Sequence, residues 1–246
     1  MRAALLLCGQ PRTMEFCYPS QKQHLLDVYC PDVFISTDDE MSRMIELYNP
    51  ISIDVRSQQD ICSRAIRMRL KYNRPENEIM TKAALSISWK CYRANQLKRK
   101  YELENGFNYD LVFISRFDVK FKKIQAVTEV KENTLYVPLI GAYHITPPDQ
   151  PGIHWLGYST HLCWMNSYVA NMLSGHTLAT EKDYVKLATE ALPINGNNPE
   201  HVLKYFCDDN KINVEFVNIE MMLIRGTSEK PLSFHNYPLE NFPEYL

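Results

Sequence analysis

The sequence predicts an α/β protein with a mostly parallel central sheet flanked by helices, folded as a single domain. Apolar runs alternate with helical segments in a β-α-β-α-β order over residues 1–55, which is typical of parallel strands joined by crossovers. The run YDLVFIS at 109–115 is almost continuously apolar, as expected of a strand buried on both faces. With 246 residues, of which 45% are apolar, the chain can bury a sizeable core.

The first part of the chain contributes three predicted strands. The apolar run at 3–7 lies in the first of them, Pro31 precedes the second, and Pro50 precedes the third. The predicted elements are, in order, strand 2–8, helix 16–29, strand 32–37, helix 41–48 and strand 51–55.

The longest predicted helix covers residues 75–104. Pro75 suits the first turn of a helix, and Gly106 suits its stop. One stripe of side chains recurs every three or four residues, which predicts a buried face: Ile79, Ala83, Ile87, Cys91, Ala94 and Tyr101.

The second part of the chain combines strands and helices with a long loop. Residues 139–160 are rich in proline, glycine, histidine and aromatic residues, and we expect a functional loop there. The last twenty residues contain three prolines and are expected to form an extended tail. The other predicted elements are strand 109–115, strand 134–138, helices 166–173, 181–191 and 199–210, and strand 214–217.

Composition and charge argue against several classes of protein. A net charge of −2 argues against a nucleic-acid binder, and we interpret the basic clusters at 64–74 and 98–100 as solvated helix faces. No run approaches the roughly 18 apolar residues of a membrane span, and the apolar run at 3–7 is too short for a signal peptide. The seven cysteines show no C-x-x-C pair, so we expect reduced thiols in a cytoplasmic protein.

The first candidate site is the corner CGQPRT at 8–13, directly after the first predicted strand. In open α/β sheets, ligands bind beyond the carboxyl ends of the strands. Gly9 lets a ligand approach the backbone, the Gln10 amide both donates and accepts, and Arg12 can pair with a phosphate. We therefore expect these residues and Cys8 to line a nucleotide site. The alternative is an ordinary strand-to-helix turn.

The second candidate site is SRFD at 115–118, where the strongest predicted strand ends. A carboxylate at this position, Asp118, can hold a divalent metal ion that bridges a diphosphate and neutralises the leaving group. Arg116 adds a further phosphate contact. The alternative is an Arg–Asp ion pair at the surface.

The third candidate site is formed by Thr37, Asp38 and Asp39 at the end of the second predicted strand. These residues can bind the base or the ribose of a nucleotide. They can equally cap the following helix, because aspartate accepts hydrogen bonds from the first backbone N–H groups of helices. Both alternatives stay open.

The 139–160 loop holds candidates for the acceptor side of a reaction. Its aromatic residues can stack on sugar rings, and a carboxylate or histidine can deprotonate a hydroxyl group. We expect His154 and Trp155 to bind an acceptor and Asp149 to act as the catalytic base; the alternative is a packed loop. His235, in the tail, is expected to close over the site and complete a metal shell.

The order of these motifs resembles a known family. The motifs are LLLCGQPRT, DVFISTDD, YELENGFNYDLVFISRFDVKF, LYVP, NPEHVLKYF and MMLIR, and they span about residues 3–225. The set is similar to the GT-A-type nucleotide-sugar glycosyltransferases of large DNA viruses of algae and of bacterial polysaccharide clusters. Those proteins open with a strand and a Gly-(Gln or His)-x-Arg corner, and later carry Tyr-Asp, an apolar strand and Arg-x-Asp.

The resemblance implies a GT-A, Rossmann-like domain with a nucleotide-binding half at about 1–120 and an acceptor-side half at about 121–246. Its Arg-x-Asp stands in for the Asp-x-Asp of other GT-A enzymes. By this resemblance Asp118 would ligate Mn²⁺ or Mg²⁺ and take part in catalysis, while Arg116 and Phe117 would lie beside the nucleotide sugar.

The function implied by the resemblance is metal-dependent transfer of a hexosyl or deoxyhexosyl group from a nucleoside-diphosphate sugar to a hydroxyl of a glycan or glycoprotein. A viral or bacterial role in glycan biosynthesis in the cytoplasm is also implied. One departure is that GIHWLG at 152–157 replaces an Asn-Asp pair present in many relatives. Two alternatives stay open: a nucleotidyltransferase on a similar sheet, and a non-catalytic module that binds nucleotide sugars.

Overall fold

A computed structural model describes residues 1–39, 42–56, 78–124, 126–138, 161–174, 203, 206–217 and 219–224, with only the backbone of 78–85. The predicted loop at 139–160, the predicted helix at 181–191, half of the one at 199–210 and the predicted tail lie outside these ranges. The elements are β1 (Ala3–Cys8), α1 (Met14–Gln21), η1 (Lys22–Leu26), α2 (Asp27–Tyr29), β2 (Asp32–Thr37), α3 (Ser42–Tyr48), β3 (Ser52–Val55), α5 (Glu78–Asn105), β4 (Leu111–Ser115), β5 (Val119–Lys123), β6 (Thr134–Pro138), β7 (Leu162–Met165), β8 (Asn213–Val217) and β9 (Glu220–Leu223).

The central sheet has seven strands in the order β3-β2-β1-β4-β7-β6-β8. Every strand runs in the same direction except β7, which pairs antiparallel with both β4 and β6. The chain moves outward from β1 to β2 and β3, and then returns to β4 on the other side of β1. The strand order therefore reverses between β1 and β4. This confirms the predicted α/β class with a mostly parallel sheet.

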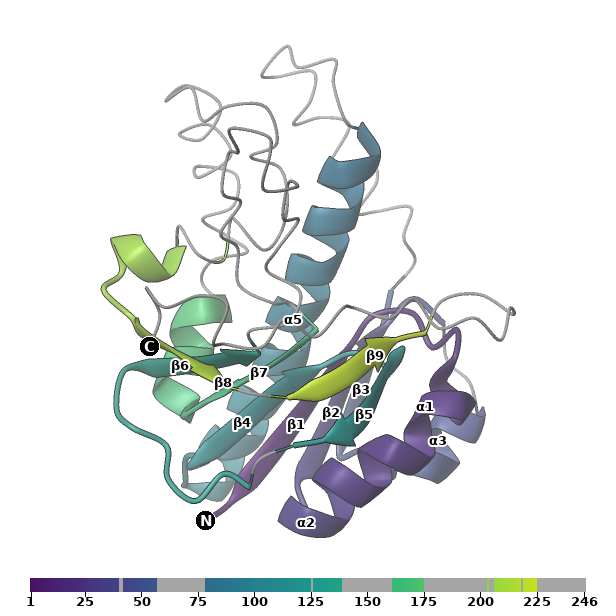
Figure 1. Ribbon diagram of the computed structural model, residues 1–246, viewed down its shortest axis with the longest axis horizontal. Helices are drawn as coiled ribbons and strands as arrows, with labels where there is room; N and C mark the ends of the chain where they lie inside the picture. The colour runs from purple at the N-terminus through teal and green to yellow at the C-terminus, as the bar shows by residue number, and fades with distance from the viewer. Residues whose placement is uncertain are drawn as a thin grey trace, which may run out of the picture.

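The two faces of the sheet are covered by different layers. On one face, alternate β1 side chains such as Leu5 and Leu7 pack among residues of α1, α3 and the two-stranded β5–β9 ribbon. On the other face, Leu6 and Cys8 pack against α5 and the helix at 167–174. Figure 1 shows α5 behind the sheet and the ribbon in front of it. The apolar β1 run is thus buried from both sides, as its composition predicts.

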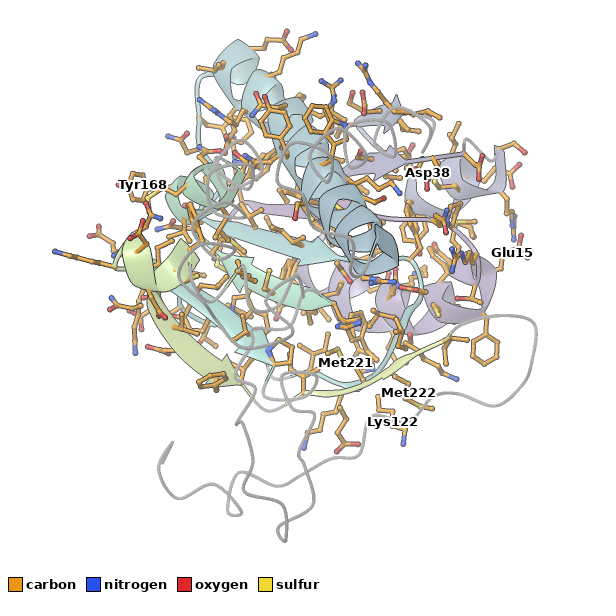
Figure 2. The ribbon with its side chains drawn as sticks, turned by 90° about the horizontal axis from the view of Figure 1, so that it is seen from above. Glu15, Asp38, Lys122, Tyr168, Met221 and Met222 are labelled. Atoms are coloured by element: carbon orange, nitrogen blue, oxygen red, sulfur yellow. The ribbon has the colours of Figure 1, made fainter. Side chains whose placement is uncertain are left out.

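Three strands were not predicted from the sequence. Strand β7 has only four residues and follows directly on the long loop, and the β5 sequence VKFKK alternates apolar residues with lysines. Strand β9, with the sequence EMML, pairs antiparallel with β5 and contributes the buried Met221 to the core (Figure 2). Pairing between distant segments decides the structure of such short runs, because their local patterns are weak.

The helix predicted at 16–29 is observed, but it begins earlier and is irregular. It starts at Met14, contains Pro19, and passes through a π-helical segment at Lys22–Leu26. Cys30 ends it in the left-handed region, with a φ of 44°. The π segment starts directly after Gln21, whose side chain is fully buried.

The long helix α5 is anchored by a buried polar cluster. The Lys98 ammonium donates to the Glu102 carboxylate at 2.9 Å and to the Ser167 hydroxyl, while Glu102 also accepts from the Tyr109 N–H at 2.9 Å. Burial lowers the pKa of Lys98, and the bond to Glu102 opposes that shift. The helix ends at Asn105, and the next residue, Gly106, has a φ of 68°, the left-handed conformation expected of a helix stop. None of the described helices is long and apolar enough to span a membrane.

We predict that Lys98→Met lowers the free energy of unfolding by about 3 kcal/mol, because it leaves the Glu102 carboxylate buried without its ammonium partner. A matched control is Lys100→Met, which removes a second Lys–Glu pair at the same spacing on α5. That pair spans 3.8 Å, and the Lys100 side chain is 74% exposed. The control should change stability by less than about 0.5 kcal/mol. Urea unfolding measures both, and equal losses would contradict the account of the cluster.

Candidate functional site

Three segments predicted to bind a ligand meet at the carboxyl edge of the central sheet. Leu7 lies opposite Ser115 in the β1–β4 ladder, and Cys8 lies opposite Ser36 in the β1–β2 ladder. The corner after β1, the end of β2 and the turn after β4 are therefore neighbours. Ligands of open α/β sheets bind at this edge where the strand order reverses, which here is between β1 and β4.

The corner after β1 leaves open space above its backbone. Gly9 has a φ of 129°, which side-chain-bearing residues rarely adopt, and a Cβ added there would meet nothing within 4 Å. Its N–H group donates to the Ser36 carbonyl at 3.2 Å, so the ladder continues one residue beyond the strand. Within the described residues, the half-buried Gln10 amide and the exposed Arg12 guanidinium make no hydrogen bond or ion pair. Both groups are available to a ligand.

The backbone of the turn after β4 is held in place by one buried side-chain amide, that of Gln21. Gln21 Nε2 lies 3.0 Å from the Arg116 carbonyl, 3.3 Å from the Phe117 carbonyl and 2.8 Å from the Val119 carbonyl. Its two hydrogens are shared among these three acceptors. The Gln21 Oε1 in turn accepts from the Tyr48 hydroxyl at 2.8 Å. The π-helical segment that follows Gln21 thus begins beside the turn, and such segments are frequent at functional sites.

The same turn is tied to the β1 corner through Ile224. The Ile224 N–H donates to the Asp118 carbonyl at 2.8 Å, and the Ile224 carbonyl accepts from the Thr13 hydroxyl at 2.8 Å. One residue beyond β9 therefore links the turn to the start of α1. The Phe117 ring is fully buried in the core. It anchors the turn, and its ring cannot stack on a ligand without leaving the core.

The predicted pair Arg116 and Asp118 forms a closed fork. Arg116 Nε donates to one Asp118 carboxylate oxygen at 2.8 Å and Nη2 donates to the other at 2.7 Å. The Asp118 side chain is 6% exposed and that of Arg116 is 20% exposed. From the sequence, an Arg–Asp ion pair at the surface was the alternative to a metal and phosphate site at these residues. The structure shows the pair, but largely buried, where a bidentate charge-assisted contact is strong.

The end of β2 carries a carboxylate with one unpartnered oxygen. Lys90 Nζ, on α5, donates to Asp38 Oδ2 at 2.7 Å and to the Ser86 hydroxyl at 3.1 Å. Asp38 is 7% exposed on its side chain, and its Oδ1 is buried with no hydrogen-bond partner among the described residues. Figure 2 shows Asp38 beside α5, on the side of the sheet away from Met221. A buried carboxylate oxygen without a partner is costly, so a water molecule or a ligand hydroxyl or N–H group that reached it would be stabilised there.

The neighbouring thiols are not activated. Burial raises the pKa of the Cys17 thiol to about 11, and it raises that of the fully buried Cys8 thiol well above its usual range. Both are therefore protonated at neutral pH and are poor nucleophiles or metal ligands. The six described cysteines are free thiols, as expected, and four of them are buried. A nucleotide could contact Cys8 only at the Cys8 backbone, because the side chain is fully buried.

The acceptor-side predictions concern a different part of the chain. Asp149, His154, Trp155 and His235 lie outside the described residues, so their roles stay predictions. Conversely, the sequence did not indicate His161, which is buried at the same edge and accepts the Ser115 hydroxyl on its carbonyl at 3.5 Å. A histidine just before a four-residue strand carries no local signal of this position.

The donor groups described at Asp118 do not fit a divalent metal ion. Manganese and magnesium need several oxygen or nitrogen ligands. In the described part of the chain, no three His, Cys, Asp or Glu side chains gather closely enough to hold one. Both oxygens of Asp118 are already bound by Arg116, and the second predicted ligand, His235, is outside the described residues.

A further hollow of about 370 Å³ lies near the end of α5, close to the opposite edge of the sheet. Its lining contains none of the residues predicted to bind a ligand: it is formed by Arg99, Glu102, Leu103, Gly106, Phe107, Asn108 and Asn171.

Comparison of the chain with protein-family models and with curated protein sequences finds no match.

We predict that Gln21→Met lowers the free energy of unfolding by about 3 kcal/mol, because it leaves buried carbonyls of the 116–119 turn without a donor. Gln23→Met is the matched control, since Gln23 is exposed on the same helical segment. It should stay within about 0.5 kcal/mol of wild type. Urea unfolding tests both, and an unchanged Gln21→Met variant would show that the turn does not need the amide.

Proposed function

We propose that this protein is a glycosyltransferase that moves a hexosyl or deoxyhexosyl group from a nucleoside-diphosphate sugar to a hydroxyl of a glycan or glycoprotein. The observation that carries the proposal is the meeting of the Gly9 corner with the Arg116 turn where the strand order reverses. Ligands with phosphates bind at this place in open α/β sheets. We propose sugar transfer in particular because the ordered motifs resemble those of GT-A-type transferases.

Each part of a nucleoside diphosphate has a matching group at this edge. The buried Asp38 Oδ1 can accept a hydrogen bond from a ribose hydroxyl or from a base N–H group. The open space above Gly9 can admit the ribose or the base close to the backbone. The guanidinium groups of Arg116 and Arg12 can pair with the phosphates. During sugar transfer their positive charge would stabilise the diphosphate as it departs.

The test is a thermal-shift screen of UDP-, GDP-, dTDP- and CMP-sugars, followed by analysis of products. We expect one class of nucleoside-diphosphate sugar to raise the melting temperature, because a ligand that binds only the native state stabilises it. Without an acceptor, slow attack by water should release the nucleoside diphosphate and free sugar. Release of pyrophosphate from a nucleoside triphosphate would instead favour a nucleotidyltransferase. Binding without any turnover, even with acceptors, would favour a non-catalytic module.

Two glycine variants locate the binding site in the same screen. Gly9→Ala places a methyl group in the open space and should weaken binding of the selected nucleotide at least about tenfold, the effect of losing roughly 1.4 kcal/mol. Gly106→Ala is the matched control, because Gly106 also has a positive φ and open space around it. Both variants should lose stability through backbone strain. Equal nucleotide affinity in the two variants would contradict a site at the β1 corner.

A further inference from the structure

We propose that the Arg116–Asp118 fork is a diphosphate-binding site that works without a divalent metal ion, with Arg116 providing the positive charge and Asp118 holding Arg116 in position. The inference rests on the proposed function, since it concerns how the donor diphosphate is bound. It differs from the expectation that Asp118 is a metal ligand. The reason for the difference is the state of the carboxylate.

The carboxylate of Asp118 is committed to the guanidinium of Arg116. Its two oxygens accept at 2.8 and 2.7 Å, and only 6% of the side chain is exposed. A dication bound through a remaining lone pair of either oxygen would stand a few ångströms from the guanidinium. Repulsion between these positive charges is large where water is excluded. The fork and a metal ion therefore compete for the same carboxylate.

The backbone carbonyl groups of the turn are all engaged in hydrogen bonds. The carbonyl groups of Arg116, Phe117 and Val119 all accept from Gln21, and the Asp118 carbonyl accepts from Ile224. Within the described residues, no cluster of metal-binding side chains supplements Asp118. Each of these carbonyl oxygens therefore has one lone pair left, and the described residues do not supply the further ligands that a magnesium or manganese ion requires.

The free face of Arg116 has the geometry of a phosphate site. A guanidinium carries five N–H groups in a planar fork, and Asp118 takes one on Nε and one on Nη2. The other three, two on Nη1 and one on Nη2, have no partner among the described residues. Nη1 and Nη2 each direct one N–H along parallel lines from the end of the group. This arrangement matches two oxygens of one phosphate, while Asp118 stays bound to the Nε–Nη2 edge of the guanidinium.

A second guanidinium lies on the segment tethered to this turn. Arg12 is exposed without an ion pair in the described part of the chain, and its neighbour Thr13 is bonded to Ile224, as is Asp118. The two arginines outweigh the single charge of Asp118. They leave a net positive charge to meet a diphosphate, as a metal ion would.

The test is calorimetric titration of the full chain with inorganic pyrophosphate, UDP and GDP, each in EDTA and in Mn²⁺. We expect at least one of these probes to bind in EDTA, with an affinity within about threefold of that in Mn²⁺. Arg116→Lys keeps the charge but loses the planar fork, and it should weaken binding about tenfold or more. Asp118→Asn should weaken it less, because Arg116 keeps its charge and its free face.

The matched control is Arg93→Lys. Arg93 donates from the same two nitrogens to Asp54 on β3, at 3.2 and 2.5 Å, but belongs to α5 rather than to the turn after β4. This variant should bind the probes as wild type does. Because Arg116→Lys risks poor folding, circular dichroism of each variant is compared, and the double variant Arg116→Met/Asp118→Leu, which removes both charges together, should fold and fail to bind.

The outcomes separate the two proposals. Binding in EDTA that Arg116→Lys weakens and Arg93→Lys preserves supports the metal-independent site. Nucleotide binding that requires Mn²⁺ and is abolished by Asp118→Asn overturns this inference and leaves the proposed function standing. No binding of any probe, with or without Mn²⁺, overturns the inference and the proposed function together.

Discussion

The turn after β4 is the constraint on which the candidate site depends. Its four successive carbonyl groups, from Arg116 to Val119, accept hydrogen bonds from the Gln21 amide and the Ile224 N–H. The turn cannot rotate without leaving several buried polar groups unsatisfied, which is costly. The fork between Arg116 and Asp118 is therefore presented in one orientation. Such fixed side chains bind a charged ligand without a further ordering cost.

Polar side chains from the layers on both faces of the sheet meet at one edge. The α5 side supplies Lys90, which holds the Asp38 carboxylate, whereas the α1 side supplies Gln21, which holds the turn. Figure 2, seen from above, shows Asp38 and Met221 on opposite sides of this edge. A ligand lying across the β1–β4 junction can therefore meet polar groups from both layers. The same two layers bury the apolar strands and so determine both stability and site.

The sequence was sufficient to predict the strands that are buried on both faces. It was also sufficient to predict where the polar residues that follow those strands lie. Apolar runs predicted β1, β2 and β4, and adjacency at one edge follows from their parallel order. The partners of those polar residues were not predictable. Gln21 and Lys90 lie within helices, where neither spacing nor composition marks them as supports. Strand β7 exists as a strand because it pairs with β4, a contact that no local pattern encodes.

A crystal structure of the protein with its preferred nucleoside diphosphate would show which groups bind the diphosphate. We expect the diphosphate to lie against Arg116 at the carboxyl ends of β1 and β4, with a ribose or base donor on Asp38 Oδ1. We also expect the Arg116–Asp118 ion pair to stay intact in the complex. A nucleotide bound instead in the hollow beside Phe107, or a metal ion on Asp118 with Arg116 turned away, would contradict these expectations.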